Sequence, residues 1–149
     1  MPEKAIIGLD YSHNNKLQLE TSSYNEFTHF LFVSGYKLAK IQAGFESLKK
    51  LQIYDAIILS TPNNKELSQD EVENLEQYVK LGGNLLIVSS MGGDHTNRTN
   101  LNELTQKFGF EFLPNQIFDS MKYINLQKRP LISKITPHLI TEQVNQLVF

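Results

Sequence analysis

The sequence predicts an α/β fold with three layers, in which a largely parallel sheet lies between two layers of helices. Short runs rich in isoleucine, leucine and valine, each long enough for a buried strand, occur at residues 4–9, 37–41, 54–59, 85–89 and 110–113. Segments with helical periodicity lie between these runs. Alternating strands and helices are typical of βαβ units, so we expect a parallel sheet covered on both faces.

The first two expected helices have apolar residues at helical spacing. The first carries Phe27, Phe30 and Leu31, and a short second one carries Phe45 and Leu48. Each follows an expected strand and precedes the next, as the crossover helix of a βαβ unit does. These helices therefore support the parallel arrangement.

The third helix has the best start and stop signals. Ser68 lies three residues before Glu71, which is the spacing of a capping box, and Gly82 with Gly83 can supply a left-handed exit. Its apolar face would carry Val72, Leu75 and Val79.

After the strand at residues 85–89, a polar loop leads to another expected helix. Asn100 with Glu103 predicts a capped start, and Gly109 predicts the end. Leu101, Leu104 and Phe108 would form its apolar face. The strand at residues 110–113 would follow, and beyond Pro114 the pattern favours a hairpin or an irregular extension. The terminal run at residues 146–149 predicts either an edge strand pairing with the sheet or a domain cut from a longer protein.

Composition limits the class of protein. A chain of 149 residues with 40% hydrophobic residues fits one domain over residues 1–149. Fourteen Lys and Arg against sixteen Asp and Glu give a net charge of -2, without a basic cluster, so nucleic acid is not an expected partner. The absence of cysteine excludes disulfides, thiolate metal sites and cysteine nucleophiles. The N-terminal apolar run is too short for a signal peptide or membrane span, so we expect a cytoplasmic protein without membrane insertion.

The polar loop after residues 85–89 is one part of a candidate ligand site. Loops at the carboxyl ends of parallel strands form the crevice in which ligands bind. Gly92 and Gly93 would allow close backbone approach, and the helix starting near Asn100 would offer free amides to an anion, beside Asp94 and His95. In the alternative interpretation, which stays open, the glycines only turn the chain and the polar side chains only solvate it.

A second polar cluster, with Asp10 and His13, follows the first expected strand. If the first and fourth strands are neighbours, Asp10 and His13 would face Asp94 and His95 across one crevice. Such a set could hold a divalent metal or a polar ligand, but its spacing is not a metal signature. We predict neither a metal nor a cofactor.

No catalytic residue is predicted. The turn at Ser89, Ser90, Met91 and Gly92 lacks the leading glycine of a serine elbow. A general acid and a general base could be assigned among Asp94, His95 and Asp10, but many polar loops would allow the same assignment. We therefore predict that the chain is not an enzyme.

The run ELSQDEVENLEQYVKLGGNLLIVSSMGGDHTNRTNLNELTQKFGFEF, residues 66–112, resembles the GIFT domain. This glutamine-amidotransferase-like domain is shared by gliding-motility transport proteins and a subunit of the intraflagellar transport B complex. The marks are the capped helix, Gly82-Gly83 before a strand, Gly92-Gly93 with Asp94, Thr99-Asn100 with Asn102, and Phe108-Gly109-Phe110. A less specific likeness extends to the first strand with Asp10 and His13, to residues 54–62 and to residues 131–144.

The resemblance implies a Rossmann-like sheet related to class I glutamine amidotransferases but without their chemistry. Ser90, Met91 and Gly92 follow the strand that resembles the elbow strand, and no cysteine is available. It implies a non-enzymatic scaffold domain of a trafficking or transport-associated protein, in which this chain would be the N-terminal part. Its partners would be proteins of a larger assembly, and a weak homo-oligomer through the terminal edge is also open. The alternative is a domain that binds a small ligand or glycan, or a degenerate hydrolase, using the same crevice.

Overall fold

The structure, a computed structural model, describes residues 4–148 and contains two compact units, Met1–Pro114 and Asn115–Phe149. The first unit holds the parallel sheet and all of the α-helices, and the second holds a small antiparallel sheet. The expectation that residues 1–149 form a single domain stays a prediction.

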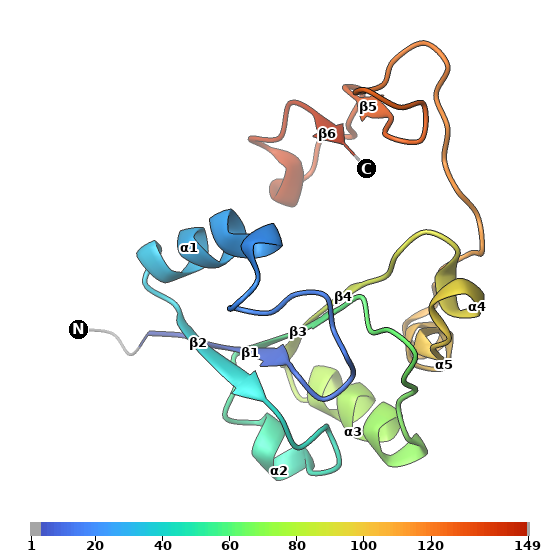
Figure 1. Ribbon diagram of the computed structural model, residues 1–149. Coiled ribbons are helices and arrows are strands. Elements are labelled where there is room, and N and C mark those ends of the chain that lie inside the picture. The colour runs from blue at the N-terminus through green and yellow to red at the C-terminus, as the bar shows by residue number, and fades with distance from the viewer. Residues whose placement is uncertain (1–3, 149) are drawn as a thin grey trace. The chain divides into compact units, whose positions relative to one another are not determined.

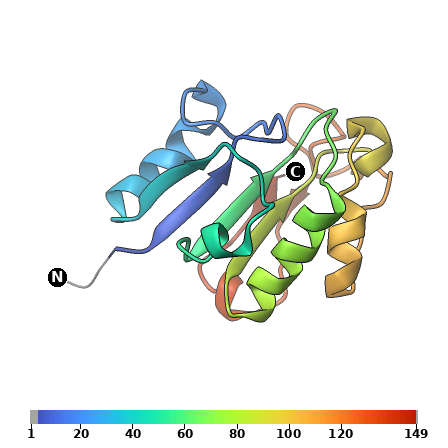
Figure 2. The ribbon, with the colours of Figure 1, turned by 90° about the horizontal axis from the view of Figure 1, so that it is seen from below.

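Four parallel strands form the sheet of the first unit (Figure 1). They are β1 (Ile6–Asp10), β2 (Lys37–Ile41), β3 (Ala56–Ser60) and β4 (Asn84–Val88), in the order β2-β1-β3-β4. β1 pairs with both β2 and β3, with Gly8 opposite Ala39 on one side and Ile57 on the other. Figure 2 shows the strands from below, all running in the same direction. Four of the predicted strands are thus confirmed.

Helices cover both faces of this sheet, which confirms the three-layer α/β class. α1 (Asn25–Val33) lies on one face, whereas α2 (Leu48–Leu51), α3 (Gln69–Lys80) and α5 (Leu101–Thr105) lie on the other (Figure 1). A further single-turn helix, α4 (Gly93–Asn97), forms within the polar loop after β4, where the sequence predicted only a loop. 3-10 turns precede α1 at Ser22–Tyr24 and follow α5 at Gln106–Phe108.

Alternation along the strands gives the sheet two apolar cores. Ile57 and Leu59 of β3 face the α3 side, while Ile58 faces the α1 side together with Leu9 of β1. On β4, Leu85 and Ile87 pack on the α3 side, but Leu86 and Val88 on the other face are exposed. α1 therefore covers its face of the sheet only in part.

The start and end of α3 follow the sequence signals. The Glu71 amide donates to Ser68 Oγ at 3.2 Å, and the Ser68 amide donates to Glu71 Oε2 at 2.9 Å, so the predicted capping box is present. Gly82 has a φ of 96°, and the Gly83 amide returns to the Tyr78 carbonyl oxygen at 2.9 Å. Of the predicted apolar face, Val72 and Leu75 are buried, and Val79 is half-buried against the same core.

The second predicted helix is shorter than expected. Phe45 precedes α2 and is not helical, because Gly44 takes a left-handed φ of 74° just before it. The Phe45 amide donates to Glu71 Oε1 at 2.9 Å, so its backbone is fixed against α3. Only Leu48 of the predicted pair lies in the helix.

The predicted fifth strand at residues 110–113 is wrong. Phe112 pairs its backbone with a side chain: its amide donates to Asn102 Oδ1 at 2.8 Å, and its carbonyl oxygen accepts from Asn102 Nδ2 at 3.0 Å. These bonds take the groups that a neighbouring strand would use. β4 is consequently an edge of the four-stranded sheet over residues 4–148.

The second unit agrees with the predicted irregular extension. β5 (Leu131–Ile132) pairs antiparallel with β6 (Leu147–Val148), a bridge joins Tyr123 to Pro130, and a 3-10 turn spans Leu139–Thr141. The terminal run thus pairs with β5 in a separate two-stranded sheet and not with the main sheet. Phe149, also part of the predicted run, lies outside the described residues.

Candidate functional site

The loops after β1, β3 and β4 meet at the carboxyl edge of the sheet. The Asn63 amide donates to the His13 carbonyl oxygen at 3.3 Å, and the Asn64 amide donates to the Asn97 carbonyl oxygen at 2.8 Å. The loop after β3 therefore lies between the other two. The condition for Asp10 and His13 to face Asp94 and His95, that the first and fourth strands are neighbours, is not met, because β3 separates β1 from β4.

Asp10 and His13 do come together, in a buried cluster at the end of β1. His13 Nδ1 lies 2.9 Å from Asp10 Oδ2, and Asn15 Nδ2 donates to the same oxygen at 2.5 Å. The Ser12 amide and hydroxyl donate to Asp10 Oδ1 at 2.9 and 2.6 Å. Because His13 is only 1% exposed, the loop after β1 is folded inward around its own polar groups.

Glu71 of α3 completes the cluster from the other side. His13 Nε2 lies 3.2 Å from Glu71 Oε2, and the imidazole stacks on Phe45 with ring centroids 5.4 Å apart. Sequence reasoning assigned Glu71 only to the capping box and missed this contact. The available signal was that a capping box uses only one of the acceptor positions of its carboxylate. Here Glu71 Oε2 accepts from the Ser68 amide and also contacts His13, while Oε1 accepts from the Phe45 amide.

The electrostatics favour an ion pair network. Burial alone would lower the pKa of His13, but hydrogen bonding and charge attraction from Asp10, and then from Glu71, outweigh it and raise the pKa above its ordinary value. For Glu71, burial would raise the pKa, but the Ser68 and Phe45 amides and the His13 charge together lower it. His13, when protonated, thus links Asp10 at the end of β1 to Glu71 of α3.

This cluster has little capacity for chemistry. Both ring nitrogens of His13 face a carboxylate, so no lone pair is left for a metal or for a proton abstracted from a substrate. Among residues 4–148, no group of three or more His, Cys, Asp or Glu side chains is placed to hold a metal ion. Asn15 Oδ1 is the only buried side-chain nitrogen or oxygen of the described residues without a hydrogen-bond partner.

A cavity of about 560 Å³ lies beside the cluster. His13 and Glu71 form part of its wall, with Ser12, Gly44 and Lys65 around them. Lys65 Nζ donates to the Ser12 carbonyl oxygen at 2.5 Å, which fixes the lysine over the loop after β1. The cavity is at the carboxyl ends of β1 and β2, not at the loop after β4.

Asp94 serves as the cap of α5. Its Oδ1 accepts from the Leu101 amide at 2.9 Å and from Thr99 Oγ1 at 2.7 Å, and its Oδ2 accepts from the Asn102 amide at 2.8 Å. The amides that sequence reasoning left for an anion are therefore occupied by this carboxylate. No described hydrogen bond or ion pair of residues 4–148 joins Asp94 or His95 to Asp10 or His13.

The sequence predicted that Asn100 would cap the start of α5. Asn100 is the N-cap residue of α5, but its side chain makes no capping hydrogen bond. Its Oδ1 accepts from the Leu67 amide at 2.7 Å, and its Nδ2 donates to the Leu67 carbonyl oxygen at 3.0 Å. Asn100 thereby ties the loop after β4 to the segment that enters α3. Asp94 takes over the capping role because the α4 turn brings its carboxylate back to the helix start.

The remaining residues of the predicted site have separate environments. Gly92 and Gly93 have φ values of 86° and 54°, and a Cβ at Gly93 would lie 3.0 Å from the Phe112 carbonyl oxygen. Gly93 therefore allows the loop to pass close to residues 110–113, whereas a Cβ at Gly92 would meet the side chain of Thr96. His95 is exposed, and Ser90 Oγ accepts from Lys16 Nζ at 2.8 Å and not from a histidine.

Comparison with known proteins agrees with this fold. A family model described as the IFT52 GIFT domain matches residues 9–134. A solved structure described as "mmIFT52 N-terminal domain" has a TM-score of 0.82 and 19% sequence identity, covering 95% of this chain and 68% of that one. No curated protein matches the sequence significantly. Because the family model spans the β1 end, the capped α3 and the loop with Asp94, the chain belongs to the family of the IFT52 GIFT domain.

Proposed function

We propose that this chain is a non-enzymatic protein-interaction domain, which acts as a scaffold in a trafficking or transport-associated protein. The family supports a transport-associated domain, since the matching model and the similar structure both carry the IFT52 description. The proposal includes proteins of a larger assembly as partners and the cytoplasm as the place of action. Among residues 4–148, no helix is long and apolar enough to cross a membrane.

The surface of α1 is the observation that carries this proposal. Thr28 and Leu31 are the buried residues of this nine-residue helix. Phe27, Phe30, Phe32 and Val33 are exposed, with Phe30 at 63% and Phe32 at 70%. A soluble domain rarely keeps several large apolar side chains of one helix in water without a binding role. We call these four residues the α1 apolar surface.

The polar residues at the carboxyl edge support the non-enzymatic part of the proposal. Asp10, His13, Asp94 and Asn100 all make hydrogen bonds that hold the chain's own loops. A hydroxyl nucleophile must give its proton to a base within hydrogen-bond reach, whereas Ser90 Oγ accepts a hydrogen bond from Lys16 Nζ and makes none to a histidine.

The cavity of about 560 Å³ beside His13 favours a second candidate, the binding of a small polar ligand or glycan. Its wall offers the hydroxyl groups of Ser12 and Ser68 together with Lys65. This candidate predicts a ligand on the β1 and β2 side of the edge, away from Gly92 and Asp94.

The test is to purify the tagged protein from its own cells and measure its partners and its hydrolytic activity together. The scaffold proposal predicts that stoichiometric protein partners stay bound through size-exclusion chromatography, and that glutamine and simple esters are not turned over. Turnover that Ser90→Ala abolishes, without any bound protein, would contradict it.

A further inference from the structure

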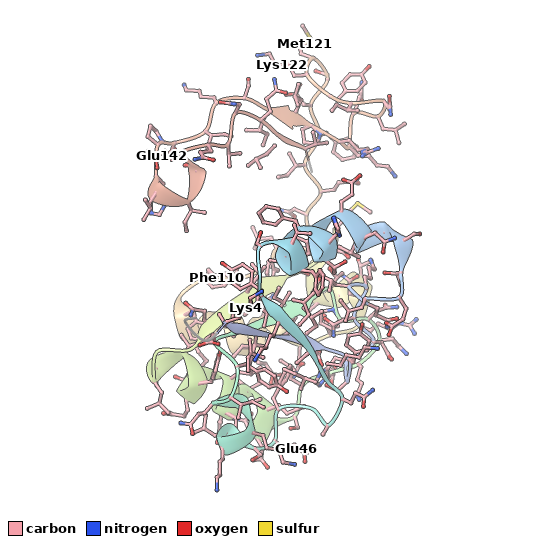
Figure 3. All side chains as sticks on the ribbon, turned by 90° about the vertical axis from the view of Figure 1, so that its left-hand side faces the viewer. Lys4, Glu46, Phe110, Met121, Lys122 and Glu142 are labelled. Carbon is pink, nitrogen blue, oxygen red and sulfur yellow. The ribbon has the colours of Figure 1, made fainter. Side chains whose placement is uncertain are left out.

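A groove runs between α1 and β2 and has a volume of about 1430 Å³. Phe32 and Val33 of α1 form one wall, and Tyr36, Lys37 and Leu38 form the other. Lys4, labelled in Figure 3, also lines the groove, and its Nζ would lie 3.3 Å from a Cβ added at Gly35. We call this feature the α1–β2 groove.

β2 borders the groove with a free backbone edge. Within residues 4–148, β2 pairs only with β1. The Lys37 amide donates to the Ala5 carbonyl oxygen at 3.0 Å, and the Tyr11 amide donates to the Ile41 carbonyl oxygen at 2.9 Å. Hydrogen-bonding direction alternates along a strand, so the amides and carbonyl groups of Leu38 and Lys40 point away from β1. No hydrogen bond among residues 4–148 uses these backbone groups.

The charge of the groove has one sign. Lys4 and Lys37 are exposed along it, and none of its lining residues within the described part of the chain, residues 4–148, is Asp or Glu. The next lysine of the edge, Lys40, is already paired with Glu20. The groove therefore attracts carboxylates at Lys4 and Lys37.

The same lysines disfavour a second copy of this chain as the occupant. Pairing two β2 edges about a two-fold axis would bring Lys37 and Lys40 of one copy near those of the other, and like charges across paired strands are destabilising. Lysines on an edge strand are a common device against self-association. An acidic strand from a different protein meets no such repulsion.

We propose that the α1–β2 groove binds an extended, acidic segment of a partner protein, which adds to the sheet as a strand beside β2. This inference rests on the proposed function and names the chemistry of one partner. Main-chain hydrogen bonds to Leu38 and Lys40 would supply affinity, and side chains would supply specificity. Side chains of a strand point alternately to its two faces. Apolar residues at every second position of the partner segment would therefore face Phe32 and Leu38, and acidic residues at the positions between them would lie on the same face of the sheet as Lys37.

The test selects short random peptides displayed on phage against the purified full chain and then measures the affinity of the selected peptides. Enriched peptides should alternate apolar and acidic residues. Phe32→Ala should weaken their binding by about tenfold or more, since it removes an aromatic anchor. Phe118→Ala is the matched control, because Phe118 is similarly exposed but lies outside the groove.

Two further measurements test the role of the lysine charge and of the free backbone edge of β2. Lys37→Glu should weaken binding by about fivefold, whereas Lys49→Glu, an exposed lysine on α2, should not. Bound peptide should also slow the solvent exchange of the Leu38 and Lys40 amides.

Three results would overturn the inference: no peptide enriched, enriched peptides that are basic or that bind all variants equally, or unchanged exchange at Leu38 and Lys40. Slow exchange at these amides without peptide, together with a dimer in sedimentation, would identify a second copy as the occupant. If partner proteins still co-purify although the groove binds no acidic peptide, only this inference fails and the scaffold proposal stands.

Discussion

Replacing His13 tests the buried cluster at the end of β1 most sharply. His13→Ala removes the contacts of 2.9 Å to Asp10 and 3.2 Å to Glu71, each involving a charged partner and worth about 1.5–3 kcal/mol. It also leaves two carboxylates without the cation between them, although Ser12, Ser68 and Phe45 amides still compensate in part. We expect the free energy of unfolding to fall by about 3–5 kcal/mol, as for other buried ion pairs that lose one partner.

The pH dependence follows from the two pKa shifts. The pKa of His13 is raised in the folded state, so its contribution is complete below the ordinary value of 6.5 and is lost as the pH rises through the folded pKa. The pKa of Glu71 is lowered, so its contribution is complete above the ordinary value of 4.5 and is lost as the pH falls through the folded pKa. Stability should therefore be greatest between these two ordinary values.

The assay is urea unfolding followed by circular dichroism across this pH range and up to neutral and alkaline pH. The unchanged protein should lose stability above the ordinary histidine pKa, with a slope of at most about 1.4 kcal/mol per pH unit from one proton. His13→Ala should lack this slope. His29→Ala, which changes an exposed histidine on α1, should cost less than about 0.5 kcal/mol. An equal slope in His13→Ala and the unchanged protein would refute the reasoning, as would a cost below about 1 kcal/mol for His13→Ala.

Two further predictions concern the loop after β4, and both are read from unfolding curves. Asp94→Ala should lower the free energy of unfolding by about 2–4 kcal/mol, because it leaves two α5 amides and a threonine hydroxyl without their acceptor. His95→Ala, which changes the exposed neighbour, should lower it by less than about 0.5 kcal/mol. Equal losses in the two variants would show that the cap is not formed. Gly93→Ala should lower the free energy of unfolding by at least about 1 kcal/mol more than Gly82→Ala does. Both glycines have a positive φ, but of the two only Gly93 has a backbone atom 3.0 Å from the added Cβ. The opposite order would mean that residues 110–113 do not pack on this loop.

The strands and the capped third helix were predictable because their signals are local. Apolar runs located β1 to β4, and Ser68 with Glu71 located the start of α3. The run at residues 110–113 carried the same apolar signal, but whether it joined the sheet depended on Asn102, whose amide bonds to the backbone ten residues away. A run of this kind does not reveal which groups its backbone will pair with.

The candidate site was predictable only within each loop. Asp10 and His13 are three residues apart and do form one cluster, but Glu71 joins them from 58 residues away. Asp94 reaches the α5 amides seven and eight residues later through a turn that the sequence did not predict. The order of strands, which separates the two clusters, has no local signal at all.

The most direct test of the scaffold account measures which partner proteins co-purify with two tagged variants of the protein. Each variant is purified from the cells in which the protein naturally occurs. One carries Phe30→Ser on the α1 apolar surface, and the other carries Ser90→Ala and His95→Ala in the loop after β4. The account predicts that Phe30→Ser loses protein partners while its melting temperature stays unchanged, and that the loop variant keeps them. The account would be contradicted if the Phe30→Ser variant kept its protein partners while the loop variant lost them. A sharp fall in the melting temperature of the Phe30→Ser variant would also contradict it, because the Phe30 side chain would then be covered by other parts of the chain itself.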